Sequence, residues 1–104
     1  MKYAILGDIH ANLEALNAVL EKANDENVDA YIGIGDVVGY NANPCECIEI
    51  LQKLSPVAVL RGNHDEYASS NDELLGFNPQ AAWAVQWTRR QLSREQKEWL
   101  AGLP

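Results

Sequence analysis

The sequence predicts an α/β domain in which a parallel β-α-β-α-β unit is followed by two helices. Three short apolar runs, each followed by a glycine within two residues, alternate with two segments whose apolar residues recur at helical spacing. The connections between them are short, and the right-handed crossover rule then makes neighbouring strands parallel. A chain of 104 residues is long enough for one such domain at most.

The first 60 residues supply the three strands and the first two helices. The first helix begins after Asn12, a residue type that caps helix N-termini, and ends in the polar stretch 24–27. The second begins with Asn43 as the cap and Pro44 as the first helical residue, and the Ser-Pro pair at 55–56 ends it. The strands are expected at residues 3–6, 28–34 and 57–60. The buried helix positions are expected to be Leu13, Leu16, Leu20, Ala23, Cys47, Ile50, Leu51 and Leu54.

The remaining residues predict two helices and no further strand. Asn78 and Pro79 repeat the cap-and-proline pattern and predict a helix that runs to about Gln91, after an irregular stretch at 66–77. Residues 93–96 have the spacing of a capping box for a short last helix, which Gly102 would end. These helices can cover the two faces of a parallel sheet only in part.

Composition and charge restrict the function. The net charge of -7, with only eight lysines and arginines, argues against dedicated nucleic-acid binding. No apolar run approaches the roughly 20 residues of a membrane helix, and Met1 leads into the first strand without a signal-peptide pattern, so a cytoplasmic location is expected. Cys45 and Cys47 are expected to be reduced and structural.

Residues of the metal-ligand type follow each predicted strand. Asp8 and His10 follow the first; in extended chain they would point the same way and reach one ion, and this donor mixture suits manganese, iron or zinc. Asp36 follows the second strand, and its two carboxylate oxygens can bridge two ions. Asn63 follows the third with a hard carbonyl oxygen, and His64 could donate a proton to a phosphoryl leaving oxygen.

Each of these elements also has a simpler interpretation. Asp8 could cap the following helix with His10 on the surface, and Asp36 could be an ordinary turn residue. Residues 63–65 could form an Asx turn with a partly buried His64, whereas in the metal-site interpretation Asp65 orients the loop. Their conjunction favours the metal site, because the carboxyl ends of parallel strands meet at one edge of a sheet and both histidines of the chain fall there.

Three motifs carry a resemblance to a known family: Gly7-Asp8-Ile9-His10, Gly35-Asp36-Val37-Val38-Gly39-Tyr40 and Gly62-Asn63-His64-Asp65. They resemble the first three signature blocks of the calcineurin-like metallophosphoesterase superfamily. The second motif, with Gly-Tyr where the protein phosphatases have aspartate and arginine, is most similar to the small bacterial and archaeal phosphodiesterase branch of that superfamily. The sequence around Phe77-Asn78-Pro79 and the following helix also resembles that branch.

The resemblance implies a four-layer α-β-β-α sandwich around two divalent ions of manganese, iron, zinc or nickel. By position, Asp8 and His10 would bind the first ion, Asp36 would bridge both, and Asn63 would bind the second. His64 would contact the phosphate and protonate the leaving oxygen. The two ions would clamp the phosphoryl group and supply a bridging hydroxide as the nucleophile.

The sequence also departs from the family pattern. Further family ligands are histidines of the second half, in a Gly-His and a Gly-His-x-His block, whereas no histidine follows His64 here. Residues 1–104 are therefore expected to be the N-terminal portion of a single domain whose C-terminal half, with the second sheet, is absent. Ala11 replaces the glycine usual after the first histidine, which is expected to tighten the loop without removing a ligand.

Two functions follow as expectations. The first is metal-dependent hydrolysis of phosphomonoesters or phosphodiesters, with this chain a weakly active or inactive fragment. The second is a non-catalytic metal-binding or assembly half-domain. In both, self-association or the missing half would hide the uncovered sheet face. A nucleotide-binding α/β domain is disfavoured because the Gly-x-Gly-x-x-Gly and P-loop patterns are absent. Tyr40 and Arg61 lie near the strand ends, but loop residues of this kind are more often merely solvated.

Overall fold

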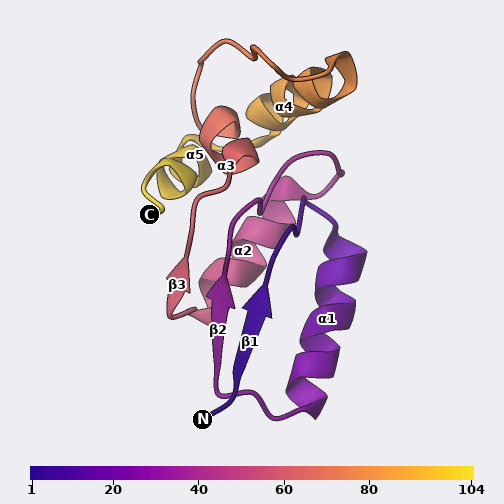
Figure 1. Cartoon of the computed structure of the whole chain (residues 1–104), viewed down its shortest axis with the longest axis vertical. Helices are drawn as coiled ribbons and strands as arrows, with labels where there is room; N and C mark the ends of the chain where they lie inside the picture. Colours follow the sequence, from indigo (N-terminus) through magenta and orange to yellow (C-terminus); the bar gives the residue numbers. More distant parts are fainter.

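The computed structural model describes residues 1–104 and contains one parallel sheet and five helices (Figure 1). The strand order is β1-β2-β3, and Ile5 pairs with Ile32, which in turn pairs with Ala58. The predicted parallel β-α-β-α-β order is confirmed, with the second and third strands shorter than expected. The elements are β1 (Tyr3–Leu6), α1 (Leu13–Asp25), β2 (Ala30–Gly33), α2 (Pro44–Leu54), β3 (Ala58–Val59), α3 (Asn63–Ala68), α4 (Pro79–Gln91) and α5 (Arg94–Ala101).

Four helices begin where their capping residues predicted. Asn12 and Asn78 each accept a backbone N–H of the first helical turn, at 3.0 and 2.8 Å. Ser93 and Gln96 form the reciprocal capping box, with bonds of 3.1 and 3.0 Å. Asn43 precedes α2 as expected, but its side chain caps no backbone N–H of that helix. The proline after Asn43 already removes one of the N–H groups that would need a partner.

One helix was not predicted. Residues 63–68 form α3, where the sequence indicated a loop followed by an irregular stretch from residue 66. The Asp65 carboxylate accepts the Gly62 N–H at 3.0 Å and so stabilises the helix start from within its first turn. Asn63 and His64 therefore lie at the N-terminus of a short helix rather than in an open loop.

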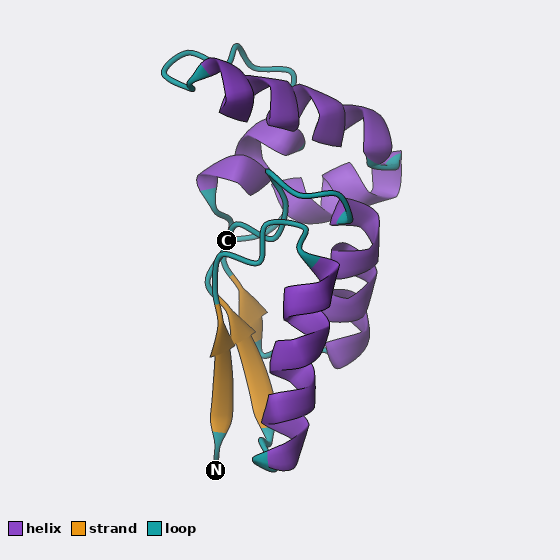
Figure 2. Cartoon of the chain, turned by 90° about the vertical axis from the view of Figure 1, so that its right-hand side faces the viewer, coloured by secondary structure: helices purple, strands orange, loops and turns teal.

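Both long helices of the β-α-β-α-β unit cover the same face of the sheet (Figure 2). The two crossovers run in the same direction along the strand order, so right-handed connections place α1 and α2 on one side. On α2 the buried stripe includes Ile48, which was not predicted, while Ile50 and Leu54 are only half-buried. Helix α2 also contacts α1 and α4, so its buried residues do not face the sheet alone. The core under the helices includes Leu6, Leu16, Cys47, Ile48, Leu51 and Val59.

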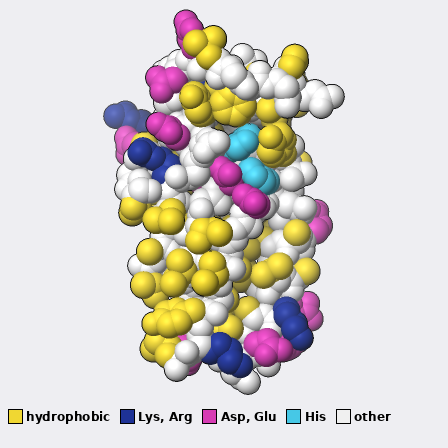
Figure 3. Space-filling model, viewed as in Figure 1, with side chains coloured by type: hydrophobic (Ala, Val, Ile, Leu, Met, Phe, Trp, Pro, Cys, Tyr) yellow, Lys and Arg dark blue, Asp and Glu magenta, His cyan; other side chains and the backbone are white.

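The opposite face of the sheet has no cover. Side chains alternate along a strand, and those that point away from α1 and α2 are apolar but open to solvent. Figure 3 looks onto this face and shows hydrophobic side chains over the strands. The exposed fractions are 48% for Tyr3, 65% for Ile5, 55% for Ile34 and 46% for Leu60.

Two further expectations concern the helices and the cysteines. None of the helices combines the length and the apolar character that a membrane span needs. Cys45 and Cys47 are free thiols. Cys47 is buried, and burial raises the pKa of its thiol to about 11.

Candidate metal centre

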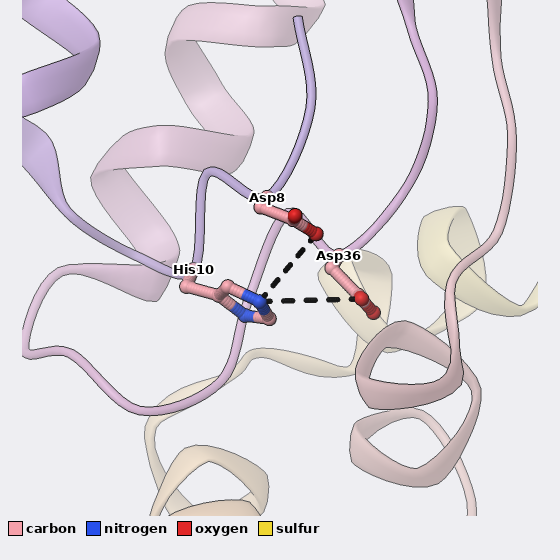
Figure 4. Close-up of side chains that lie close together, drawn as sticks. All are labelled: Asp8, His10 and Asp36. Atoms are coloured by element: carbon pink, nitrogen blue, oxygen red, sulfur yellow. Dashed lines mark ion pairs between the residues drawn. The ribbon is translucent and has the colours of Figure 1, made fainter.

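Three of the residues predicted as metal ligands lie together at the carboxyl ends of β1 and β2 (Figure 4). One ligand atom from each of Asp8, His10 and Asp36 lies within 4.8 Å of the others. The His10 Nε2 atom is 3.7 Å from the Asp8 carboxylate and 4.0 Å from the Asp36 carboxylate. Two loops that are 26 residues or more apart in the chain thus place their donors around one point.

The His10 ring is oriented toward the two carboxylates by a hydrogen bond on its far side. Its Nδ1–H donates to the Val38 carbonyl oxygen at 3.0 Å. This bond selects the tautomer in which Nε2 carries a lone pair, the form that binds a metal. Two carboxylates and an imidazole in this form fit a divalent ion of the manganese, iron or zinc type. The ligand roles themselves stay a prediction.

The sequence predicts an extended backbone at Asp8 and His10, but in the structure the backbone that presents these donors is not extended. Asp8, His10 and Asp36 have φ angles of 47°, 46° and 55°, in the left-handed region. Asp8 and His10 therefore meet through a coiled loop rather than through strand alternation. Ala11 also has a positive φ, of 56°, a conformation that glycine adopts at lower cost. Each such residue costs about 1–2 kcal/mol, so other interactions must hold the loops.

Backbone hydrogen bonds join the first loop to the second. The His10 N–H donates to the Asp36 carbonyl oxygen at 2.9 Å, and the Ala11 N–H donates to the Val37 carbonyl oxygen at 2.8 Å. The Asn43 N–H at the start of α2 donates to the Ala11 carbonyl oxygen at 3.0 Å. The position of His10 relative to Asp36 is therefore set by main-chain geometry.

Asp65 holds the second loop to the third. It is fully buried, and its two carboxylate oxygens accept four backbone N–H groups. The donors are Asp36 at 2.8 Å, Val37 at 2.9 Å, Val38 at 3.2 Å and Gly62 at 3.0 Å. Burial raises the pKa of this carboxyl even though the N–H bonds oppose the shift. The suggestion that Asp65 orients the loop is confirmed, and it acts on two loops at once.

His64 is held beside the cluster by aromatic contacts. Its ring lies 4.6 Å from the ring of Tyr40, 5.0 Å from that of His10 and 5.6 Å from that of Phe77, measured between centroids. The side chain is 7% exposed, and its Nδ1 atom has no hydrogen-bond partner. Burial lowers the pKa of His64, since its charged form loses hydration. Burial in this arrangement therefore favours the neutral form of the ring.

Gly39 makes room for that ring. A Cβ atom at residue 39 would lie 2.5 Å from the Nδ1 atom of His64, and the backbone φ of 101° is one that side chains rarely adopt. Any larger residue at this position would push His64 away from the cluster. The glycine of the second motif thus determines where the histidine of the third motif can lie.

Asn63, the fourth predicted ligand, is less closely tied to the cluster. It is the exposed first residue of α3, and its side chain makes no hydrogen bond. Its neighbour His64 donates its backbone N–H to the Asp36 carboxylate at 3.1 Å, which brings the start of α3 to the edge of the site. The role of Asn63 as a ligand therefore stays a prediction.

Tyr40 and Arg61, which both lie near the strand ends in the sequence, have different surroundings in the structure. Tyr40 contacts both histidine rings, at 5.0 and 4.6 Å, and the signal was the Gly-Tyr pair that ends the second motif. Arg61 points away from the site and donates to the Ala101 carbonyl oxygen at 2.9 Å. Phe77 was noted only as part of a resemblance, because its contact with His64 depends on how an irregular segment folds back.

Comparison with known proteins places this arrangement in a family. The family model of calcineurin-like phosphoesterases matches residues 1–103. The chain is 41% identical over 101 residues to the uncharacterized protein MJ0912 of Methanocaldococcus jannaschii, covering 97% of this chain and 41% of that protein.

A solved structure agrees with the sequence comparison. The crystal structure of a metallophosphoesterase from Sphaerobacter thermophilus superposes with a TM-score of 0.84 at 42% identity. The match covers 100% of this chain and 42% of that one, so the chain spans about two fifths of the length of the relatives it matches. With the family model matched over nearly every residue, this chain belongs to the calcineurin-like phosphoesterase family.

Proposed function

We propose that this chain carries the N-terminal share of a metal-dependent phosphoesterase site that hydrolyses phosphomonoesters or phosphodiesters. The observation that carries the proposal is the convergence of Asp8, His10 and Asp36, with the Nε2 atom of His10 turned toward both carboxylates. Membership of the calcineurin-like phosphoesterase family supports the reaction class. We further infer that residues 1–104 form the first part of a longer domain, since the relatives extend well beyond them.

The residues have separable roles in this proposal. Asp8 and His10 would hold one divalent ion, Asp36 would contact two, and Asn63 would hold the second. Bound divalent ions would polarise the phosphoryl group and favour ionisation of water near it. His64, whose backbone is tied to Asp36, would contact the phosphate and give its ring proton to the leaving oxygen. For this step the His64 ring would have to be in its imidazolium form, which a bound phosphate anion beside it would favour.

Manganese binding and hydrolysis test the proposal together. Mn²⁺ binding to the purified chain is measured by isothermal titration calorimetry, and hydrolysis of bis-p-nitrophenyl phosphate is measured with and without Mn²⁺. Asp36→Asn is expected to reduce Mn²⁺ affinity about 100-fold or more, because it removes a charged donor from the centre of the cluster. Asp25→Asn, at the exposed end of α1, is the matched control and is expected to change nothing.

Turnover by this chain alone is expected to be low, because four candidate residues do not complete two metal sites. In a longer protein that contains this chain, Asp36→Asn is expected to abolish hydrolysis. Unchanged Mn²⁺ affinity in Asp36→Asn, or near-wild-type turnover in the longer protein, would contradict the assignment.

A second candidate function is a non-catalytic assembly module. The observation that favours it is the uncovered apolar face of the sheet, which another chain could bury. This reading predicts Mn²⁺ binding without hydrolysis and a stable dimer at micromolar concentration. A monodisperse monomer in sedimentation velocity runs would exclude it.

A further inference from the structure

An aromatic groove adjoins the candidate metal centre. It is about 410 Å³ in volume and lies between the loop after β2 and helix α4. Figure 3 shows hydrophobic side chains bordering the two histidines at this end of the molecule. The lining residues are Tyr40, Asn41, Ala42, Trp83 and Trp87, none of which is charged.

The groove and the metal centre share one wall. The Tyr40 ring lines the groove and also lies 5.0 Å from the His10 ring and 4.6 Å from the His64 ring. If the phosphoryl group of a phosphate ester lies at Asp8, His10 and Asp36, the group attached to that phosphate could therefore lie over the Tyr40 ring.

The groove surface is suited to a flat ring. Trp83 and Tyr40 are large aromatic side chains that are 62% and 55% exposed, and Trp87 lies one helical turn beyond Trp83. Such side chains stack on nucleobases, whereas Asn41 supplies an amide that can hydrogen-bond to a ring edge. Tyr40 adopts a φ of 66°, an unfavourable conformation for a large residue, between two residue types that tolerate it better.

We propose that this groove binds the nucleobase of a nucleotide ester whose phosphate lies at the metal centre, and so selects nucleotides as substrates. The inference rests on the proposed function for the position of the phosphate. The lack of charge in the lining favours a neutral planar ring over a second phosphate or a carboxylate. Trp83 is the residue expected to contribute most, since it is the most exposed of the three rings.

The three indole N–H signals of the ¹⁵N-labelled chain provide the test. Trp83 and Trp87 line the groove, whereas Trp99 lies on α5 in a different depression and serves as an internal control. The chain is titrated with adenosine 5′-monophosphate, ribose 5-phosphate and adenosine in the presence of Zn²⁺. Adenosine 5′-monophosphate is expected to shift the Trp83 and Trp87 signals saturably and to leave Trp99 unchanged. It is expected to bind about tenfold more tightly than ribose 5-phosphate.

A pair of variants separates stacking from general effects. Trp83→Leu is expected to remove the tenfold preference while leaving the affinity for ribose 5-phosphate unchanged. Leucine favours helices and cannot stack, so the fold of α4 is retained. Tyr3→Leu removes an exposed aromatic ring far from the groove and is expected to keep the preference.

The outcomes distinguish this inference from the proposed function. If both phosphate esters shift the Asp36 backbone amide equally and no indole signal moves, the groove inference is overturned while phosphate binding stands. If adenosine shifts Trp83 and Trp87 but neither ester moves Asp36, the groove inference is supported and the phosphate site is not. Unchanged indole signals with all three compounds would show that the groove binds no nucleobase.

Discussion

The polar edge of the sheet is held by hydrogen bonds within this chain, whereas the uncovered face of the sheet is left exposed to solvent. At the edge, Asp65 bonds to two loops at once, and main-chain bonds fix His10 against Asp36. On the face, Ile5 and Ile34 are more than half exposed. No helix or loop of the chain covers this side of the strands (Figure 2). The contacts that hold the edge all come from this chain, whereas burial of the face would need residues from outside this chain.

Substitutions at the edge and on the face are expected to affect different properties of the chain. The loops of the edge hold several residues at positive φ, so their geometry persists only because buried hydrogen bonds compensate the strain. The apolar face makes few intrachain contacts that a substitution could remove. Changes at the edge should therefore lower the stability of the isolated chain, and changes on the face should alter its association instead.

The largest loss is expected for Asp65→Asn. The amide keeps one acceptor oxygen but turns N–H groups toward backbone N–H groups that now lack a partner. Each unsatisfied buried group costs about 1–3 kcal/mol, so we expect the free energy of unfolding to fall by about 4 kcal/mol. Urea denaturation followed by circular dichroism measures it, with Asp25→Asn as the exposed control. A loss below about 1 kcal/mol would mean that the edge is not held by Asp65.

The next effect contrasts the two faces of the sheet directly. Leu51→Ala, under the helices, removes a side chain that is 1% exposed and is expected to cost about 3 kcal/mol. Ile5→Ala, on the uncovered face, is expected to stay within about 0.5 kcal/mol of the parent. The same denaturation measurement compares them at low protein concentration. Equal losses at the two positions would show that the uncovered face is already buried in solution.

A smaller effect is expected for Gly39→Ala. The added methyl group meets the His64 ring, and the φ of 101° disfavours any side chain. Overpacking of this kind costs about 2 kcal/mol. The His64 ring resonances in NMR spectra should move, whereas Gly76→Ala, with open space around its Cβ position and a similar φ of 87°, should leave them in place. Unmoved His64 resonances in Gly39→Ala would contradict the proposed packing.

Much of the fold could be predicted because it depends on local signals. Short apolar runs located three strands, and helical spacing together with capping patterns located four helices, with residues such as Asn12 and Ser93 marking where helices begin. Helix α3 could not be found this way, because its first turn is stabilised by a carboxylate that mainly serves distant loops. The alternation rule also failed for Asp8 and His10, whose backbone is bent by bonds to residues after β2.

The candidate site was predictable as a set of residues but not as an arrangement. Asp8, His10 and Asp36 could be brought together by the rule that parallel strands end at one edge. The orientation of the His10 ring depends on the Val38 carbonyl, which carries no side-chain signal. The groove beside Tyr40 depends on how α4 returns to the site after the irregular segment, and no local pattern specifies that path.

The smallest effect on stability, and the one that best separates the two regions, is expected for Ile5→Ser combined with Ile34→Ser. Both side chains lie on the uncovered face, and Ile34 also lies over Gly7. Making the face polar should leave the unfolding free energy of the monomer within about 1 kcal/mol while weakening self-association at least tenfold. Sedimentation velocity between 5 and 200 μM, roughly the range in which weak dimers form, measures the change.

Leu75→Ser provides the matched control, because Leu75 is an exposed apolar residue that lies beside α3 rather than beside the strands. If the parent chain is monomeric throughout this range, the face is not a surface for a second copy. Its apolar character then indicates burial by the further residues of a longer chain, as the length of the relatives suggests. If Leu75→Ser weakens association as much as the double variant does, association is a general effect of surface hydrophobicity. If only the double variant loses self-association, the uncovered face of the strands is the surface that a second copy buries.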